Sequence, residues 1–174
     1  MAQMSKRSAA ILATTIFAST LLLGRANARD DATDELTSAT ERNRAAIAAG
    51  LQAWVDGVGS PYDLLSEHAR WTITGNSRAA RTYPTKRAFI DEVIGPFDAR
   101  LSERLIPTVH RLYAEGDTVI AHFDARGAAR DGKPYVNTYA WILRMEGGQI
   151  VEAHAFFDAI AFDDLWTRVT PAGD

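Results

Sequence analysis

The feature that most constrains this chain is a series of four β-type segments in its second half, each separated from the next by a turn signal. The segments are Arg104–Tyr113, Thr118–Arg126, Tyr135–Met145 and Ile150–Asp158. The pairs between them favour tight turns: Glu115-Gly116, Asp131-Gly132 and Gly147-Gly148. Connections this short join neighbouring strands in antiparallel fashion, so this half of the chain predicts a four-stranded meander.

Helical patterns precede and follow the meander. Apolar residues recur at helical spacing between Thr33 and Val58, at Ile47, Leu51, Trp54, Val55 and Val58. A short strand, Ala69–Thr74, separates this helix from a second one, which Thr85 caps and which runs to Ala99 unless Pro96 ends or kinks it early. A closing amphipathic segment carries Phe162, Leu165, Trp166 and Val169. Helices first and a curved meander second predict an α+β domain.

The N-terminus has the features of a secretory signal over residues 1–28. It combines a charged start at Lys6-Arg7, an apolar stretch from Ala9 to Leu23, and a small-x-small cleavage pattern at Ala26-Asn27-Ala28. The alternative is a membrane anchor, but a span needs about 20 apolar residues and this run is shorter and diluted by Thr and Ser. We expect cleavage after Ala28, one domain over residues 29–174, and a periplasmic or secreted protein.

The charge and cysteine content exclude several classes of function. Three of the 19 basic residues lie before residue 29, which leaves 16 against 22 acidic residues, a net charge of −6 for the remainder. Phosphate binding needs clustered Lys and Arg, so we expect no nucleic-acid partner. The chain has no cysteine, which rules out disulfides, thiolate metal sites and a cysteine nucleophile. We also expect no membrane association after cleavage.

Three stretches carry a resemblance to a known family: Trp71-Thr-Ile-Thr-Gly75, Gly95-Pro96-Phe97, and the long segment from Tyr139 to Asp158. With the order of elements, they resemble the SnoaL-like, ketosteroid-isomerase-like branch of the nuclear transport factor 2 (NTF2-like) superfamily. The resemblance implies a cone, in which a strongly curved, mostly antiparallel sheet wraps around helices and a pocket lies between them. It implies a small hydrophobic or aromatic ligand and, in an enzyme, a cofactor-independent isomerase, cyclase or hydrolase. The alternative is a non-catalytic ligand-binding or dimerisation module, which allows a homodimer.

Strand alternation selects the residues that line such a pocket. Side chains two positions apart share a face, so Asn137, Tyr139 and Trp141 lie together. With Trp71 and Phe157 they are our candidates for substrate binding. For the aromatic members, the competing interpretation is plain core packing.

His122 and Asp124 are the candidates for catalysis. On one strand face, a carboxylate two residues from an imidazole can fix its tautomer and raise its basicity, which predicts His122 as base and Asp124 as its orienting partner. The competing interpretation is an ordinary hydrogen-bonded pair that orders the strand. A metal site that adds His154 is disfavoured, because strand parity turns His154 away from the pocket; we therefore expect no metal and no cofactor.

The resemblance also implies where family carboxylates would fall. In limonene-epoxide-hydrolase-like relatives an Arg-x-Asp pair matches His122 and Asp124, and a second Asp matches Ala155. Polyketide-cyclase-like relatives place an acid near Ala155, and ketosteroid isomerase places its base near Ile73 and Thr74. Asp124 keeps the first of these carboxylates, but Ala155, Ile73 and Thr74 carry none, which favours the non-catalytic alternative. We expect Asp158 to cap the closing segment, and we assign no partner to His68 or His110.

Overall fold

The computed structural model describes the backbone of residues 16–172 and the side chains of residues 33–172. Its first helix, α1 (Ile16–Asp56), ends where Gly57 adopts a left-handed φ of 74°. Ile47 and Leu51 are buried in the core, as their spacing predicts. Val58 was expected on the same stripe, but it lies beyond the end of the helix and is 81% exposed.

The chain divides into two units, Met1–Ser38 and Ala39–Asp174. The described part of the first unit, residues 16–38, is entirely helical. The charged start of the expected secretory signal falls in residues 1–15, outside the described residues, and cleavage after Ala28 stays a prediction. Among the described residues, no helix is long and apolar enough to cross a membrane.

A short helical turn, η1 (Pro61–Leu64), follows α1 and positions Tyr62. The Ser60 side chain accepts a hydrogen bond from the backbone N–H of Tyr62 at 3.2 Å, and Asp63 Oδ2 accepts one from the backbone N–H of Ser60 at 2.7 Å. These reciprocal bonds form a capping box. The capping box fixes where the turn begins, and it therefore fixes the backbone from which the Tyr62 side chain projects.

The helix predicted after Thr85 is built from three consecutive segments: α2 (Lys86–Phe89), η2 (Ile90–Ile94) and α3 (Gly95–Asp98). The Thr85 side chain caps it, as predicted, by accepting a hydrogen bond from the backbone N–H of Ala88 at 3.1 Å. Pro96 does not end the helix early. The preceding segment is a π-helix in which the Gly95 N–H bonds to the Ile90 carbonyl, and this wider turn accommodates a proline ring that lacks an N–H.

Six strands form one sheet: β1 (Leu65–Ile73), β2 (Thr82–Tyr83), β3 (Leu101–Glu115), β4 (Thr118–Ala129), β5 (Pro134–Glu146) and β6 (Gln149–Phe157). Their order is β2-β1-β6-β5-β4-β3, and every pair is antiparallel except β1 with β6. The predicted meander is confirmed as β3 to β6. The parallel β1–β6 pair was not predicted, because no turn signal links strands so distant in sequence.

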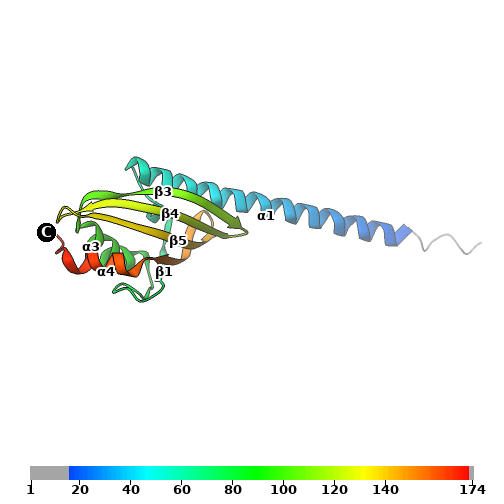
Figure 1. Cartoon of the computed structure of the whole chain (residues 1–174). Coiled ribbons are helices and arrows are strands. Elements are labelled where there is room, and N and C mark those ends of the chain that lie inside the picture. Colours follow the sequence, from blue (N-terminus) through cyan, green and yellow to red (C-terminus); the bar gives the residue numbers. More distant parts are fainter. Residues whose placement is uncertain (1–15, 173–174) are drawn as a thin grey trace, which may run out of the picture. The chain divides into compact units, whose positions relative to one another are not determined.

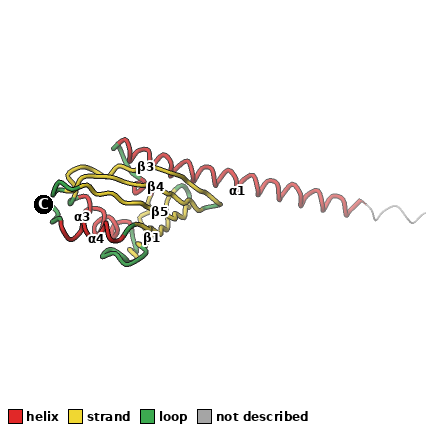
Figure 2. The backbone as a smooth tube through the Cα atoms, in the orientation of Figure 1, coloured by secondary structure: helices red, strands yellow, loops and turns green. Residues whose placement is uncertain are grey.

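The sheet is curved and does not close, as Figure 2 shows. Irregular register in β3, including a shift between Val109 and Arg111, helps the strand bend. At the β5–β6 turn, Gly147 and Gly148 both have positive φ, 56° and 80°, which suits a two-residue hairpin. Helices and a mostly antiparallel, unclosed sheet make this the α+β fold that the sequence predicts.

The last helix, α4 (Ala159–Arg168), confirms that the closing segment is helical. Asp158 caps it, as expected, because its Oδ1 accepts a hydrogen bond from the backbone N–H of Ile160 at 2.8 Å. The rings of Phe97 in α3 and Phe162 in α4 stack with centroids 5.9 Å apart, so the two helices lie side by side (Figure 1). Phe97 and Phe162 also line the cavity described below.

Candidate functional site

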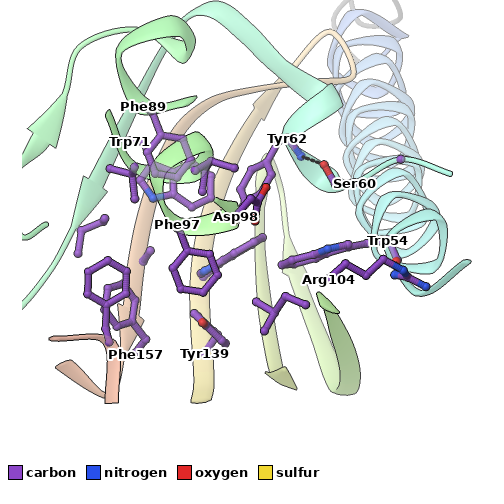
Figure 3. A pocket seen from close by; sticks show the side chains of 18 of the residues that line it. Trp54, Ser60, Tyr62, Trp71, Phe89, Phe97, Asp98, Arg104, Tyr139 and Phe157 are labelled. Carbon is purple, nitrogen blue, oxygen red and sulfur yellow. Dashed lines mark hydrogen bonds between the residues drawn. The ribbon is translucent and has the colours of Figure 1, made fainter. Parts of the chain in front are cut away.

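A cavity of about 250 Å³ lies on the inner face of the sheet, between the strands and the helices (Figure 3). Nine aromatic side chains line it: Trp54, Tyr62, Trp71, Phe89, Phe97, Tyr139, Trp141, Phe157 and Phe162. An engineered apolar cavity of about 150 Å³ holds benzene, and typical ligand pockets begin at about 300 Å³. The cavity is therefore of a size for one substituted ring or a similarly small molecule.

The aromatic walls support one another. Trp54 from α1 stacks on Trp141 from β5, with centroids 5.9 Å apart and planes 16° apart. Trp71 from β1 stacks on Phe89 from α2 at 4.4 Å, and its ring meets Trp141 edge-on at 5.1 Å. Because each ring is held by others from distant parts of the chain, the walls are formed before any ligand arrives.

Asp98 is the single carboxyl group among the lining residues. It is the last residue of α3, one helical turn after Ile94, which also lines the cavity. Asp98 is exposed at the cavity edge, and its partial burial there raises the pKa of its carboxyl. Figure 3 shows Asp98 beside the Tyr62 ring.

Two tyrosines place hydroxyl groups in the same cavity. Burial raises the pKa of Tyr62 far above its ordinary value, and the nearby negative charge of Asp98 raises it further. Burial raises the pKa of Tyr139 as well, with a smaller contribution from Tyr135. Both hydroxyls stay protonated at neutral pH and can donate hydrogen bonds to a bound molecule.

Arg104 in β3 also lines the cavity, but its guanidinium is already occupied. Nη1 donates to the carbonyl of Trp54 at 2.6 Å, and Nη2 donates to the carbonyl of Val55 at 2.7 Å. These carbonyls belong to the last turn of α1, the negative end of that helix. A Cβ at Gly57 would lie 3.1 Å from the guanidinium carbon, so a glycine there lets Arg104 approach. Arg104 thereby fixes Trp54 at the cavity wall.

Four of the five predicted substrate-binding residues line the cavity: Trp71, Tyr139, Trp141 and Phe157. Asn137 shares their buried face but is not in the wall. Its Nδ2 donates to Tyr135 Oη at 2.9 Å, and its Oδ1 accepts a hydrogen bond from the backbone N–H of Asp158 at 2.9 Å. The hydroxyls of Tyr135 and Tyr139 are also hydrogen-bonded, at 3.0 Å. Asn137 therefore supports the wall from behind, through Tyr135.

The structure places His122 and Asp124 on the outer face of the sheet, so the expectation that this pair lies in the cone is wrong. On β4 it is Phe123, between them, that is buried. Asp124 is also paired differently from the prediction. Its Oδ2 lies 2.9 Å from His110 Nε2, and its Oδ1 accepts a hydrogen bond from Thr138 at 2.7 Å. We call His110, His122, Asp124 and Thr138 the outer cluster.

The other histidines lie outside the cavity as well. His110, to which we assigned no partner, contacts Asp124 and packs its ring against His122, with centroids 4.9 Å apart. His154 points away from the cavity, as parity predicts, and lies 3.7 Å from a Glu152 carboxylate oxygen. His68 is exposed. Among the described side chains, those of residues 33–172, no three His, Asp or Glu are grouped so that they could hold a metal ion.

Comparison with known proteins agrees with this geometry. The model of the SnoaL-like domain family matches residues 62–153, more than half of the chain. The chain belongs to the SnoaL-like domain family. No curated protein matches its sequence. The cavity lies largely within the matched residues.

Solved structures show the same fold at low sequence identity. Bal32a, from a soil-derived mobile gene cassette, is 20% identical with a TM-score of 0.61, and the match covers 73% of this chain and 98% of that one. TerC, co-crystallised with polyporic acid, is 17% identical with a TM-score of 0.58, covering 72% and 98%. A protein with a ketosteroid-isomerase-like fold from Catenulispora acidiphila, in complex with trimethylamine, is 18% identical with a TM-score of 0.50, covering 63% and 82%.

Two of the positions at which the resemblance placed family carboxylates face the cavity of this SnoaL-like protein. Ile73 and Ala155 both line it, and they are partners in the β1–β6 register. Asp98, the acidic residue of the wall, comes instead from a helix. Sequence reasoning missed it, although a signal was present: Asp98 is four residues after Ile94, on the apolar side of the predicted helix.

Proposed function

We propose that this SnoaL-like protein binds a small, largely apolar or aromatic molecule in the cavity, and that Asp98 is the group that exchanges a proton with it. One observation carries the proposal: a single carboxyl group lines a cavity with aromatic walls, and partial burial raises its pKa. Catalytic carboxylates are tuned in this way, because burial moves their pKa toward the working pH.

The arrangement suits cofactor-independent acid–base chemistry, as in an isomerase, cyclase or hydrolase. An ionised Asp98 can take a proton from the bound molecule, and the protonated form can return it. The hydroxyls of Tyr62 and Tyr139 can donate hydrogen bonds to an oxygen that gains negative charge in the reaction. Asp98 therefore replaces His122 and Asp124 in our hypothesis for the reacting groups.

Two fold neighbours support a small-molecule ligand. One was co-crystallised with polyporic acid and another is in complex with trimethylamine. Neither ligand is assigned to this chain. Their presence in the same fold favours a site for a small molecule over a purely structural role.

Binding can be tested with 4-ethylphenol as the probe, followed by tryptophan fluorescence in the protein from residue 29 onward and in the full chain. The variant Ala155→Leu adds three carbon atoms to the cavity wall. Ala140→Leu makes the same change on the outer side of the neighbouring strand. We expect probe affinity to fall about tenfold or more in Ala155→Leu and to stay unchanged in Ala140→Leu.

Ala155→Val is a milder second variant, in case the leucine prevents folding. Equal affinities in all folded variants would refute binding in the cavity. Proton exchange is tested separately, by following deuterium exchange at the α-carbon of phenylacetone. We expect Asp98→Asn to slow catalysed exchange at least about a hundredfold and His122→Ala to leave it unchanged. The reverse pattern would return the catalytic role to the outer cluster.

A second candidate function is self-association through the outer face of the sheet. This face exposes large apolar side chains: Ile106, Tyr113, Val136, Ile142 and Phe156. Exposed apolar patches of this kind mark interaction sites. Sedimentation equilibrium would show a dimer that Ile142→Glu disrupts, whereas a monomer at millimolar concentration would contradict this candidate.

We also propose that the protein acts in the periplasm or after secretion, with residues 1–28 removed. The support is the order of charged, apolar and small residues in that segment. Intact mass of the protein recovered from a bacterial periplasm should correspond to a chain that begins at Arg29. A mass that includes residue 1 would contradict cleavage.

A further inference from the structure

The charges of the cavity are unevenly compensated. Asp98 and Arg104 are the charged residues of its wall, and Arg104 is held by the carbonyls of Trp54 and Val55. Among the side chains of residues 33–172, the Asp98 carboxyl forms no hydrogen bond or ion pair, although it lines the cavity beside the Tyr62 ring. A carboxylate at the edge of an aromatic cavity without a protein partner can pair with a bound group that supplies positive charge.

The walls favour one kind of cation. The faces of Trp, Tyr and Phe attract cations, and Trp does so most strongly. Three tryptophans, Trp54, Trp71 and Trp141, meet in this cavity together with Tyr62. An ammonium group carrying alkyl substituents gives up less hydration than a primary amine and gains contact with the rings. Such a group suits a site with aromatic walls and a single carboxyl.

We propose that the preferred ligand of this cavity is a small organic cation, an alkylated ammonium group on a compact apolar body, with Asp98 as its counter-ion and the tryptophans as its cage. The inference rests on the proposed function, because it specifies what the same cavity binds. An anionic ligand would meet the charge of Asp98, and a neutral one would leave that carboxyl without a partner.

The groups that face Asp98 determine how pH acts. Tyr62 from η1 interacts with Asp98 directly, Tyr139 from β5 and Arg104 from β3 share the cavity wall with it, and Arg100, two residues further along the chain, bonds to the Pro96 carbonyl. The tyrosines are neutral and the arginines charged over the range in which a carboxyl titrates. Binding of a permanently charged ligand should therefore weaken as acid protonates Asp98.

The test compares choline with 3,3-dimethylbutan-1-ol, which has the same shape but a carbon atom in place of the charged nitrogen. Isothermal titration of the whole protein would measure both, with 4-ethylphenol as a third ligand. We expect choline to bind about tenfold or more tightly than the alcohol, and Asp98→Asn to remove most of that preference. Asp91→Asn is the matched control, since it makes the same change in the same helical stretch but outside the cavity wall.

Each possible result either supports the inference or overturns it. Equal binding of choline and the alcohol, or a preference for choline that Asp98→Asn retains, overturns the inference and leaves cavity binding intact. Absence of binding by choline while 4-ethylphenol binds also overturns it. If no ligand of the three binds, both the inference and the proposed function fail. Should Asp98→Asn not fold, the acid dependence of choline binding to the unmodified protein gives the same answer, because a pH-independent affinity would contradict a role for Asp98.

Discussion

The inner and outer faces of β4 and β5 are built from alternate residues of the same two strands, yet they have opposite chemistry. The inner face carries Phe123, Tyr139 and Trp141, which are buried and contact one another as rings. The outer face carries the outer cluster, in which Asp124 accepts hydrogen bonds within reach of solvent. A one-residue step along a strand separates the cavity wall from a solvated polar network.

The comparison shows that a cluster of polar side chains is a weak guide to a site in this fold. The outer cluster has two imidazoles and a carboxylate but lies outside the aromatic cavity, whereas the inner face forms that cavity and draws its carboxyl from α3. The pKa values of the two carboxyl groups shift in opposite directions. Hydrogen bonds lower the pKa of Asp124, first from Thr138 and then from His110, while burial raises the pKa of Asp98.

The largest expected contrast is in stability. Trp141→Ala removes a ring that is 2% exposed and contacts five other aromatic rings of the cavity and core, so we expect a loss of about 3 to 5 kcal/mol in the free energy of unfolding. His122→Ala, on the outer face, should change it by no more than about 0.5 kcal/mol. Urea denaturation measures both; similar losses would mean that the two faces are not energetically distinct.

A smaller contrast is expected between neighbouring residues of β5. Asn137→Ala leaves the backbone N–H of Asp158 without its partner and removes one of the two hydrogen bonds of the Tyr135 hydroxyl, so it should cost about 1 to 3 kcal/mol. Thr138→Ala removes one solvent-accessible hydrogen bond to Asp124 and should cost less. If Thr138→Ala proved the more damaging of the two, the support that Asn137 gives to the cavity wall would be in doubt.

Asp98 and Asp124 should respond to pH with opposite signs. Because the pKa of Asp98 is raised on folding, the native state holds its proton longer, and Asp98 lowers stability as pH rises through its raised pKa. In Asp98→Asn, the urea midpoint of unfolding should depend less on pH over the range above the ordinary carboxyl pKa. A variant with the unmodified slope there would show that the Asp98 carboxyl is not desolvated.

The smallest effect is expected from Asp124. Its lowered pKa means that it stabilises the fold above the ordinary carboxyl pKa, and that this contribution is lost as pH falls through the lowered value. Asp124→Asn should therefore weaken the protein slightly at neutral pH and not at all in strong acid. A loss of stability that persists in strong acid would point to packing rather than charge.

Strand alternation accounts for most of what the sequence could predict of the fold and the walls. Turn signals located the meander, and parity put Tyr139 and Trp141 on the buried face. Parity alone cannot say which side of a strand faces inward. On β4, the apolar residues Val119, Ala121 and Phe123 mark the inner side. The prediction instead placed the alternate, polar residues on that side, among them His122.

The remaining features depend on contacts between distant segments. Arg104 reaches the end of α1, and β1 pairs with β6 in parallel, neither of which has a local signature. Asp98 and Tyr62 lie on separate helical segments and meet only after the sheet has curved around them. Such meetings are consequences of tertiary packing, so the cavity could be anticipated more readily than its acidic group.

The most direct test of the account is an NMR titration of the protein with 4-ethylphenol, observing the indole N–H signals of the four tryptophans and the imidazole signals of the four histidines. We predict shifts for Trp54, Trp71 and Trp141, with Trp166, which is outside the cavity wall, as an internal control that does not move. The imidazoles of His110 and His122 should not respond. Shifts confined to those imidazoles, with unchanged indoles, would contradict the claim that the inner face is the functional one.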